Sequence, residues 1–208
     1  MTAAMTADTD LAVHIVDDEE ALRDALAFLF ASRGIATRLW PSGEALLAGW
    51  PQPGCGCLIL DVRMDGMSGP QVLDALSAQE GGVDALPPVI FLTGHADVPL
   101  AVQSLKAGAF DFVEKPFNDN QIVDLALSAI ALRRDRVAAA RDRLNLEQRR
   151  ASLSAREVEV MVLMLQGRLN KQIADDLGIS MRTVEAHRSR VLAKMGARNI
   201  AELARMLS

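Results

Sequence analysis

The sequence lacks any apolar run close to the roughly 20 residues that a helix needs to cross a bilayer. Its first ten residues, MTAAMTADTD, have neither the basic start nor the apolar stretch of a secretory signal, and residues 1–10 are predicted to form a short flexible tail. Hydrophobic residues make up 50% of the chain and charged residues 24%, which excludes disordered and fibrous classes. These features predict a globular cytoplasmic protein with no membrane partner.

Cysteine is also scarce, since Cys55 and Cys57 are the only two in the chain. No further cysteine and no nearby histidine completes the ligand set of a zinc site. We interpret both thiols as structural residues of an apolar strand. A redox or metal-binding role is the alternative interpretation.

The charges are unevenly distributed over 208 residues, a length that suits two modest domains. Residues 1–120 contain 17 acidic and 6 basic side chains, a net charge of -11, whereas residues 121–208 contain 10 and 16, a net charge of +6. An acidic half joined to a basic half predicts that only the second half binds a polyanion. A chance asymmetry between two solvated surfaces is the alternative.

In the first 120 residues, short apolar runs alternate with longer amphipathic segments, which is typical of a doubly wound α/β fold with a parallel sheet. The first, third and fourth apolar runs are almost continuous, as expected for strands covered by helices on both faces. The expected strands are 11–16, 35–40, 57–60, 88–92 and 109–113, and the expected helices are 19–33, 42–48, 69–79, 98–107 and one that begins near 118.

Beyond this first domain, at 11–130, the pattern is helical throughout. Residues 131–151 are rich in arginine and alanine and contain no glycine or proline, so we expect a helical linker. Residues 152–208 are expected to form an all-α domain of four helices at 155–166, 170–177, 181–195 and 199–207. Capping pairs and glycine stops bound these helices, namely Ser154 with Glu157, Asn199 with Glu202, Gly167 and Gly178.

Polar residues follow four of the predicted strands, namely Asp17 and Asp18, Asp61, Thr93 and Lys115. Because parallel strands end at one edge of a sheet, these side chains should meet there. Three clustered carboxylates repel one another unless a divalent cation lies among them, and oxygen ligands favour Mg²⁺. Asp61 could then act as a nucleophile toward a phosphoryl group, with Thr93 and Lys115 binding its remaining oxygens. Each residue alone could instead be a cap, a turn residue or a surface charge.

The segments IVDD, LILDVRMDGMSG, VIFLTGHAD and FDFVEKPF resemble the receiver domains of two-component response regulators. The resemblance implies a flavodoxin-like five-stranded sheet in the order 2-1-3-4-5 and a sensor histidine kinase that phosphorylates Asp61. It also implies Mg²⁺ bound by Asp17, Asp18, Asp61 and the backbone carbonyl of Arg63, and a cis bond between Lys115 and Pro116. Such a receiver catalyses only its own phosphorylation and dephosphorylation, so the chain is not expected to be an enzyme.

The same resemblance assigns roles to residues around the phosphorylation site. Asp65 stands where receivers of this type usually have proline, which frees the backbone and adds a carboxylate near the site. Arg63 and His95 occupy positions that control access of water, although both could be ordinary solvated side chains. Phe112 stands at an aromatic switch position that responds to Thr93, and a buried strand phenylalanine is the alternative.

The segment NKQIADDLGISMRTVEAHRSRVLAKMG contains a short helix, a turn with glycine and a longer second helix that could enter a major groove. The region from 153 to 206 resembles the LuxR-type DNA-binding domain, and its pairing with a receiver resembles the FixJ/NarL family. The resemblance places Thr183, Glu185, Ala186 and Ser189 near base edges or phosphates. Positive charge comes from Lys171, Arg182 and Arg188 at phosphates and from His187 on the same helix. The last helix is either a dimer contact or part of the local core.

The predicted function is therefore that of a phosphorylation-dependent transcriptional regulator, in which phosphate on Asp61 shifts the protein toward a DNA-binding dimer. The expected partners are a sensor histidine kinase and double-stranded promoter DNA, with RNA polymerase as a further candidate. Two alternatives stay open. The acidic cluster could serve an aspartyl-phosphate phosphatase or phosphotransferase, or the receiver could be only a dimerisation module of a constitutive DNA-binding protein.

Overall fold

A computed structural model describes residues 11–52, 54–94, 105 and 108–207 of the chain. The chain divides into two compact units, Met1–Arg136 and Val137–Ser208. The expected tail at 1–10 and nearly all of the expected helix at 98–107 lie outside the described residues. Within the described part of the chain, no helix is long and apolar enough to span a membrane.

The N-terminal unit contains a five-stranded parallel sheet in the order β2-β1-β3-β4-β5, which confirms the predicted fold and strand order. Three predicted strand starts were wrong by two residues, and the fifth strand begins at Asp111 instead of 109. The third strand begins two residues earlier than expected, and the second begins at Thr37 because only its last four residues pair with β1. The strands are β1 (Ala12–Val16), β2 (Thr37–Trp40), β3 (Cys55–Asp61), β4 (Val89–Thr93) and β5 (Asp111–Glu114).

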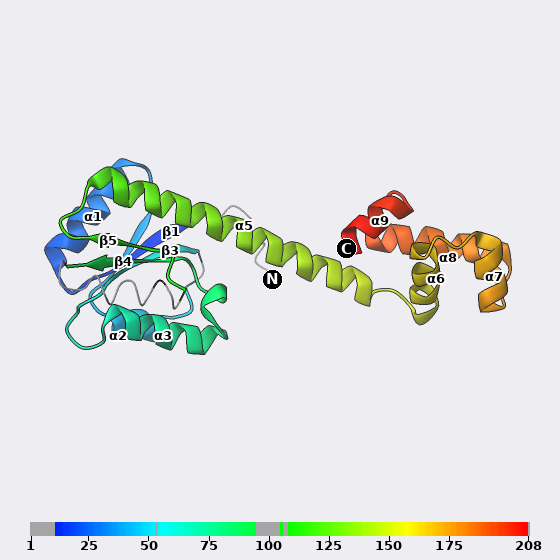
Figure 1. Ribbon diagram of the computed structural model, residues 1–208, viewed down its shortest axis with the longest axis horizontal. Coiled ribbons are helices and arrows are strands. Elements are labelled where there is room, and N and C mark those ends of the chain that lie inside the picture. Colours follow the sequence, from blue (N-terminus) through cyan, green and yellow to red (C-terminus); the bar gives the residue numbers. More distant parts are fainter. Residues whose placement is uncertain (1–10, 53, 95–104, 106–107, 208) are drawn as a thin grey trace, which may run out of the picture. The chain divides into compact units, whose positions relative to one another are not determined.

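Helices cover both faces of this sheet. One face packs against α1 (Glu20–Ser32) and the first turns of α5 (Asp119–Ala151), and the other packs against α2 (Gly43–Ala48) and α3 (Gly69–Glu80), as Figure 1 shows. A short 3-10 helix, Val83–Ala85, follows α3. Alternate residues of a strand point to opposite faces of the sheet. Because helices cover both faces, the side chains of β1, β3 and β4 are buried on both sides, as the apolar runs predicted.

The two cysteines lie at a bulge in β3. The register of β1 against β3 shifts between Ala12 and Val13, so that Ala12 pairs with Cys55 and Val13 with Cys57. The extra residue places the two side chains in the separate apolar clusters on either face of the sheet. Burial raises the pKa of Cys55 to about 12 and the pKa of Cys57 well above its usual range. Both groups are therefore protonated thiols, which supports their structural interpretation.

Residues 131–151 continue α5 without a break, so the segment that we expected to be a helical linker is helical. Near the start of this segment, the Arg133 guanidinium donates a hydrogen bond to the carbonyl oxygen of Ala85 over 3.0 Å. The absence of proline leaves every backbone N–H of this stretch able to join the helix, and the absence of glycine avoids its entropic cost in a helix.

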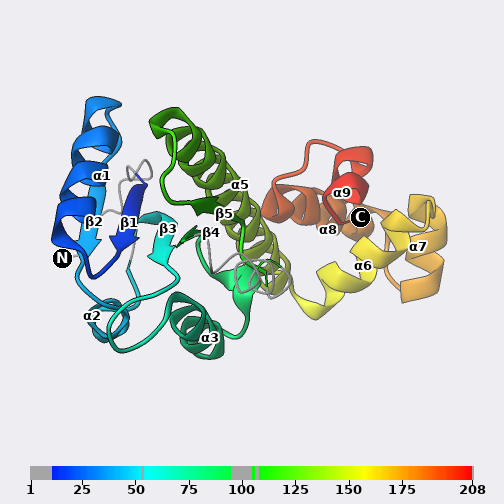
Figure 2. The same cartoon turned by 60° about the vertical axis from the view of Figure 1, so that its left-hand side comes forward.

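In the C-terminal unit, α6 (Ala155–Leu165), α7 (Asn170–Leu177) and α9 (Ile200–Leu207) pack against α8 (Met181–Met195), as Figure 2 shows. The predicted capping box of Ser154 is present at the start of α6. The second predicted box was wrong. Asn199 accepts from the backbone N–H of Glu202, but the Glu202 carboxylate binds the backbone N–H and guanidinium of Arg198 instead.

Candidate functional site

Three carboxylates meet at the carboxyl edge of the sheet. Asp17 and Asp18 follow β1, Asp61 ends the neighbouring strand β3, and one carboxylate oxygen from each lies within 4.8 Å of the other two. Asp17 is fully buried and Asp61 is 8% exposed, whereas Asp18 faces solvent. Closely spaced oxygen donors that are open to solvent on one side suit a cation such as Mg²⁺, which keeps several of its waters. The donor set therefore fits the predicted metal.

Lys115 reaches this cluster from the end of β5. Its Nζ lies 2.9 Å from Asp17 Oδ2 and 3.2 Å from Asp61 Oδ2. Burial lowers the pKa of the Lys115 ammonium, but the hydrogen bond to Asp17 and the charges of Asp61 and Asp17 together outweigh this effect and raise it. The ammonium group therefore stays charged beside Asp61. The peptide bond from Lys115 to Pro116 is cis, as the sequence resemblance implied.

The electrostatics of Asp61 are those of a crowded carboxylate. Burial raises its pKa, and the nearby charge of Asp17 adds to this effect, while Lys115 and a hydrogen bond from the backbone N–H of Arg63 oppose it. Additional positive charge at the cluster would favour the ionised form that can attack a phosphoryl group. Arg63 thus lies against Asp61 through its backbone, and its carbonyl as a metal ligand stays a prediction.

Gly69, the first residue of α3, lies directly behind Asp61. A Cβ at this position would clash with the Asp61 carbonyl oxygen and would lie 2.9 Å from the ring of Phe91. The backbone N–H of Gly69 also donates to the carbonyl oxygen of Val62 over 3.1 Å. Only glycine therefore allows α3 to begin so close to Asp61. The sequence prediction placed Gly69 at the start of a helix but missed this role, because the pattern around a helix start does not show which backbone atoms pack against it.

Thr93 and Phe112 lie on the two strands beyond Asp61. Thr93 is fully buried and its hydroxyl donates to the carbonyl oxygen of Gly94 over 3.1 Å. The N–H of Lys115 donates to the carbonyl of Thr93, so the ends of β4 and β5 are adjacent. Phe112 is half-buried and packs against the core on the α3 side of the sheet. Its role as a switch stays a prediction, and His95 lies outside the described residues.

The predicted DNA-reading residues lie on α8, apart from Lys171 on α7. The inner face of α8 buries Val184 and Val191 in the core of the C-terminal unit. Ser180 Oγ accepts from the backbone N–H of Thr183 and lies 2.8 Å from its hydroxyl, so Thr183 also takes part in the N-cap of α8. His187 and Arg188 are half-buried and flank the inner face. The exposed residues are Arg182, Thr183, Glu185, Ala186 and Ser189 of α8 and Lys171 of α7.

An ion pair holds the other end of α8. Lys194 Nζ donates to Glu157 Oε2 over 2.6 Å and to the carbonyl oxygen of Ser152 over 3.0 Å. The hydrogen bond from Lys194, followed by that from the backbone N–H of Ser154, lowers the pKa of Glu157 to about 2. Glu157 therefore stays ionised and ties the last turn of α8 to the first turn of α6.

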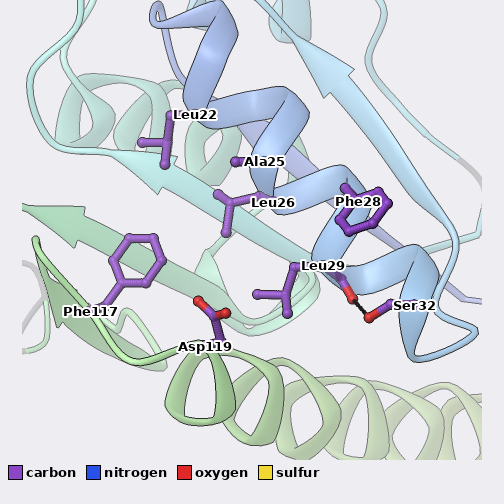
Figure 3. A pocket seen from close by; sticks show the side chains of 8 residues that line it. All are labelled: Leu22, Ala25, Leu26, Phe28, Leu29, Ser32, Phe117 and Asp119. Atoms are coloured by element: carbon purple, nitrogen blue, oxygen red, sulfur yellow. Dashed lines mark hydrogen bonds between the residues drawn. The ribbon is translucent and has the colours of Figure 1, made fainter.

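A cavity of about 360 Å³ lies between α1 and the start of α5, away from the acidic cluster. Figure 3 shows that the polar groups among the labelled side chains are few, and Ser32 donates to the Leu29 carbonyl within its own helix. This lining offers no arrangement suited to phosphate chemistry. The lining residues are Leu22, Ala25, Leu26, Phe28, Leu29, Ser32, Phe117 and Asp119.

Comparison with known protein families assigns both units. Residues 13–127 match the response regulator receiver domain, and residues 151–207 match the luxR family of bacterial regulatory proteins. The chain belongs to the response regulators with a LuxR-type DNA-binding domain. It is thus a two-component transcriptional regulator, as the sequence motifs predicted.

Relatives of this response regulator match it over nearly their whole length. The C4-dicarboxylate transport transcriptional regulatory protein DctR of Rhodobacter capsulatus is 76% identical over 194 residues, which cover 93% of this chain and 98% of that protein. The transcriptional regulatory protein FixJ of Rhizobium meliloti (strain 1021) is 44% identical and covers 95% of both chains. Among solved structures, the response regulator StyR matches with a TM-score of 0.86 and 35% identity, covering 94% of this chain and 97% of StyR. Full-length FixJ from B. japonicum matches with a TM-score of 0.59 and 38% identity over 96% of each chain.

Proposed function

We propose that Asp61 of this response regulator accepts a phosphoryl group from a sensor histidine kinase in a Mg²⁺-dependent reaction, and that phosphorylation favours a DNA-binding dimer. The observation behind this proposal is the meeting of Asp17, Asp18 and Asp61 with the Lys115 ammonium at one edge of the sheet. Receiver and LuxR-type family membership supports a kinase partner and a DNA partner.

In the proposed reaction, one carboxylate oxygen of Asp61 forms a bond to phosphorus as the bond from phosphorus to the histidine nitrogen of the kinase breaks. Asp17, Asp18, Asp61 and the carbonyl of Arg63 would hold Mg²⁺, whose charge offsets that of the carboxylates and the phosphoryl oxygens. Lys115 stays ion-paired beside the new acyl phosphate. The Thr93 hydroxyl would exchange its bond to Gly94 for one to a phosphoryl oxygen.

The proposed output is a population shift rather than turnover of a substrate. Movement of Thr93 and Phe112 would change the receiver surface and favour dimers that place two copies of α8 on paired half-sites. The receiver would catalyse only its own phosphorylation and dephosphorylation. As a regulator of transcription it would act in the cytoplasm, on promoter DNA and with RNA polymerase as a further partner.

The target genes are proposed from the relative DctR, whose name refers to C4-dicarboxylate transport. Identity of 76% over 98% of that protein supports the same class of target for this chain. We therefore propose that this regulator controls transcription of C4-dicarboxylate transport genes.

One experiment tests the proposal against both alternatives. The purified chain and an Asp61→Asn variant are incubated with acetyl phosphate and Mg²⁺, and phosphate incorporation, oligomeric mass and affinity for C4-dicarboxylate transport promoter fragments are measured. The expected result is phosphate, dimer and tighter DNA binding in the wild type only. Equal DNA affinity of the variant would favour a constitutive DNA-binding protein. Turnover of a small phosphomonoester that survives deletion of residues 150–208 would favour an enzyme.

A further inference from the structure

We propose that the C-terminal turns of α5 form a second DNA contact, in which Arg143 and Arg150 bind backbone phosphates beside the helix-turn-helix. This inference rests on the proposed DNA-binding function and extends it to a segment outside the LuxR-type match, which begins at residue 151. The ligand of these two arginines is the phosphate backbone of the same DNA duplex that α8 contacts.

The charge distribution is the first argument. Residues 131–151 contain seven arginines and three acidic residues, a net charge of +4, whereas residues 152–208 contain nine basic and six acidic residues, a net charge of +3. The helix that precedes the DNA-binding domain thus has a larger positive excess than the domain itself, in less than half the length. Double-stranded DNA attracts such a surface because phosphate contacts release condensed counterions.

The last turns of α5 are also fixed to the DNA-binding unit. Leu146 packs against the apolar core formed by α6 to α9. Arg149 Nη1 donates to the carbonyl oxygen of Met195, the last residue of α8, over 3.0 Å. In the opposite direction, Lys194 of α8 donates to the carbonyl oxygen of Ser152, just after α5. Side chains on these turns therefore move together with α8, and their position relative to its C-terminal end is set before DNA binds.

Helical geometry places four of the seven arginines of residues 131–151 in two rows. At about 100° per residue, Arg143 and Arg150 point about 40° to 60° from the direction of Leu146, so they flank the side that packs on the domain. Arg134 and Arg141 point about 120° to 140° from the direction of Leu146 around the helix axis. Each row has a spacing of seven residues, about 10 Å along the helix axis. All four side chains are exposed, and the rows differ both in direction and by nine residues, about 13 Å, along the helix axis.

Arg143 and Arg150, the two arginines that flank Leu146, are available to a ligand. Among the described residues, neither the Arg143 nor the Arg150 guanidinium has a hydrogen bond or ion pair, whereas Arg149 is bound to Met195. Arg143 also lines a cavity of about 320 Å³ together with Leu146, Arg149 and Met206 of α9. Two cations that lack internal partners beside a DNA-binding unit are complementary to phosphate.

The test compares two pairs of substitutions with the same change in charge. Full-length wild type, R143Q/R150Q, R134Q/R141Q and R143K/R150K are titrated with a labelled duplex of mixed sequence at several KCl concentrations. Because each phosphate contact contributes about 0.9 to the slope of log affinity against log salt, R143Q/R150Q should reduce the slope by about 2. R134Q/R141Q should keep the wild-type slope, and R143K/R150K should restore it because the charge is retained.

Three outcomes would overturn the inference. Equal loss of slope in both glutamine pairs would mean that only the overall charge of the chain matters, and no loss in either would mean that the helix does not touch DNA. Failure of R143K/R150K to restore the slope would mean that the glutamine pair acts by disturbing the fold. Absence of salt-dependent binding in the wild type would instead refute the proposed DNA-binding function, and the inference would fall with it.

Discussion

The backbone N–H of Asp65 donates a hydrogen bond to Oδ2 of Asp18 over 2.9 Å. Asp65 stands where the sequence resemblance leads one to expect proline, which has no N–H to donate. The presence of Asp65 in place of proline therefore does more than free the backbone and add a carboxylate. This hydrogen bond orients Asp18, an exposed carboxylate of the proposed Mg²⁺ site.

Asp65→Pro should weaken Mg²⁺ binding because it removes this hydrogen bond to a metal ligand. Loss of a supporting contact of this kind typically costs about 10-fold or more in metal affinity. Asp65→Ala is the matched control, since it removes the same carboxylate but keeps the N–H. Mg²⁺ titrations followed by Trp fluorescence, and phosphorylation rates against Mg²⁺ concentration, should show a clear shift for the proline variant only. If the two variants reach half-saturation at the same Mg²⁺ concentration, the Asp65 N–H has no role in Mg²⁺ binding.

Gly69→Ala should impair both folding and phosphorylation of the N-terminal unit. The added methyl group would press on the Asp61 carbonyl and Phe91, and overpacking of this kind costs about 1–3 kcal/mol. Gly81→Ala is the comparison, because Gly81 has φ of +81° but, among the described residues outside its immediate chain neighbours, no atom lies within 4 Å of where a Cβ would be. Backbone strain should lower the unfolding free energy of the Gly81→Ala variant by about 1 kcal/mol, while its phosphorylation rate with acetyl phosphate stays at the wild-type level. The idea fails if Gly69→Ala is phosphorylated as fast as Gly81→Ala.

His14 should make the N-terminal unit sensitive to acid. The imidazole is fully buried, Trp40 Nε1 donates to its Nδ1 over 3.2 Å, and its Nε2 has no hydrogen-bond partner among the described residues. Burial, together with the charge of Arg38, lowers its pKa from 6.5 to about 4. The unfolded chain therefore binds a proton at His14 more readily than the folded chain does. The stability that the folded unit has with a neutral His14 is complete above pH 6.5 and is lost as the pH falls toward 4.

The corresponding variant is His14→Asn, which keeps an acceptor for Trp40 but does not titrate. The difference in unfolding free energy between wild type and variant should change by up to about 3 kcal/mol between pH 7 and pH 4, to the disadvantage of the wild type. Urea unfolding followed by Trp fluorescence measures this unit alone, since Trp40 and Trp50 are the only tryptophans in the chain. Parallel curves for the two proteins across this range would contradict the prediction.

Arg149→Met should loosen the C-terminal unit. It removes a charge-assisted hydrogen bond to the α8 terminus in a half-buried setting, with an expected cost of about 1 kcal/mol. Arg150→Met, one position further, removes an arginine without such a contact and should leave stability nearly unchanged. Thermal unfolding by circular dichroism, with hydrogen exchange at the last turn of α8, distinguishes the two. Equal stability of both variants would show that the Arg149 contact contributes nothing.

Much of the N-terminal unit could be predicted from the sequence because its signals are local. Continuous apolar runs identify strands buried on both faces, and the polar residue after each run marks the carboxyl edge of the sheet. Asp17, Asp18, Asp61 and Lys115 were therefore expected to meet, and the structure brings them together. Helix boundaries in the C-terminal unit were also close to those expected, because caps and glycine stops act within one turn.

The predictions that failed depended on competition between neighbours. Asn199 and Glu202 have the spacing of a capping box, yet the Glu202 carboxylate binds Arg198 because a guanidinium and a backbone N–H are offered there together. The second strand is shorter than its apolar pattern because its length is set by pairing with β1 alone. Which of these hydrogen bonds and strand pairs form depends on which partner lies nearest in the folded chain. The spacing of residues in the sequence does not specify that partner.

By itself, the sequence determined the alternation of strands and helices, the acidic cluster and the helix-turn-helix, since each follows from periodicity or from residue type at a strand or helix end. Only the tertiary structure revealed that Gly69 must lie against the Asp61 carbonyl, that Asp65 orients Asp18 and that Arg149 holds the end of α8. These contacts join residues from different elements through backbone atoms, which every residue possesses. A sequence pattern cannot distinguish them until the chain has folded and brought those atoms within hydrogen-bonding or van der Waals distance.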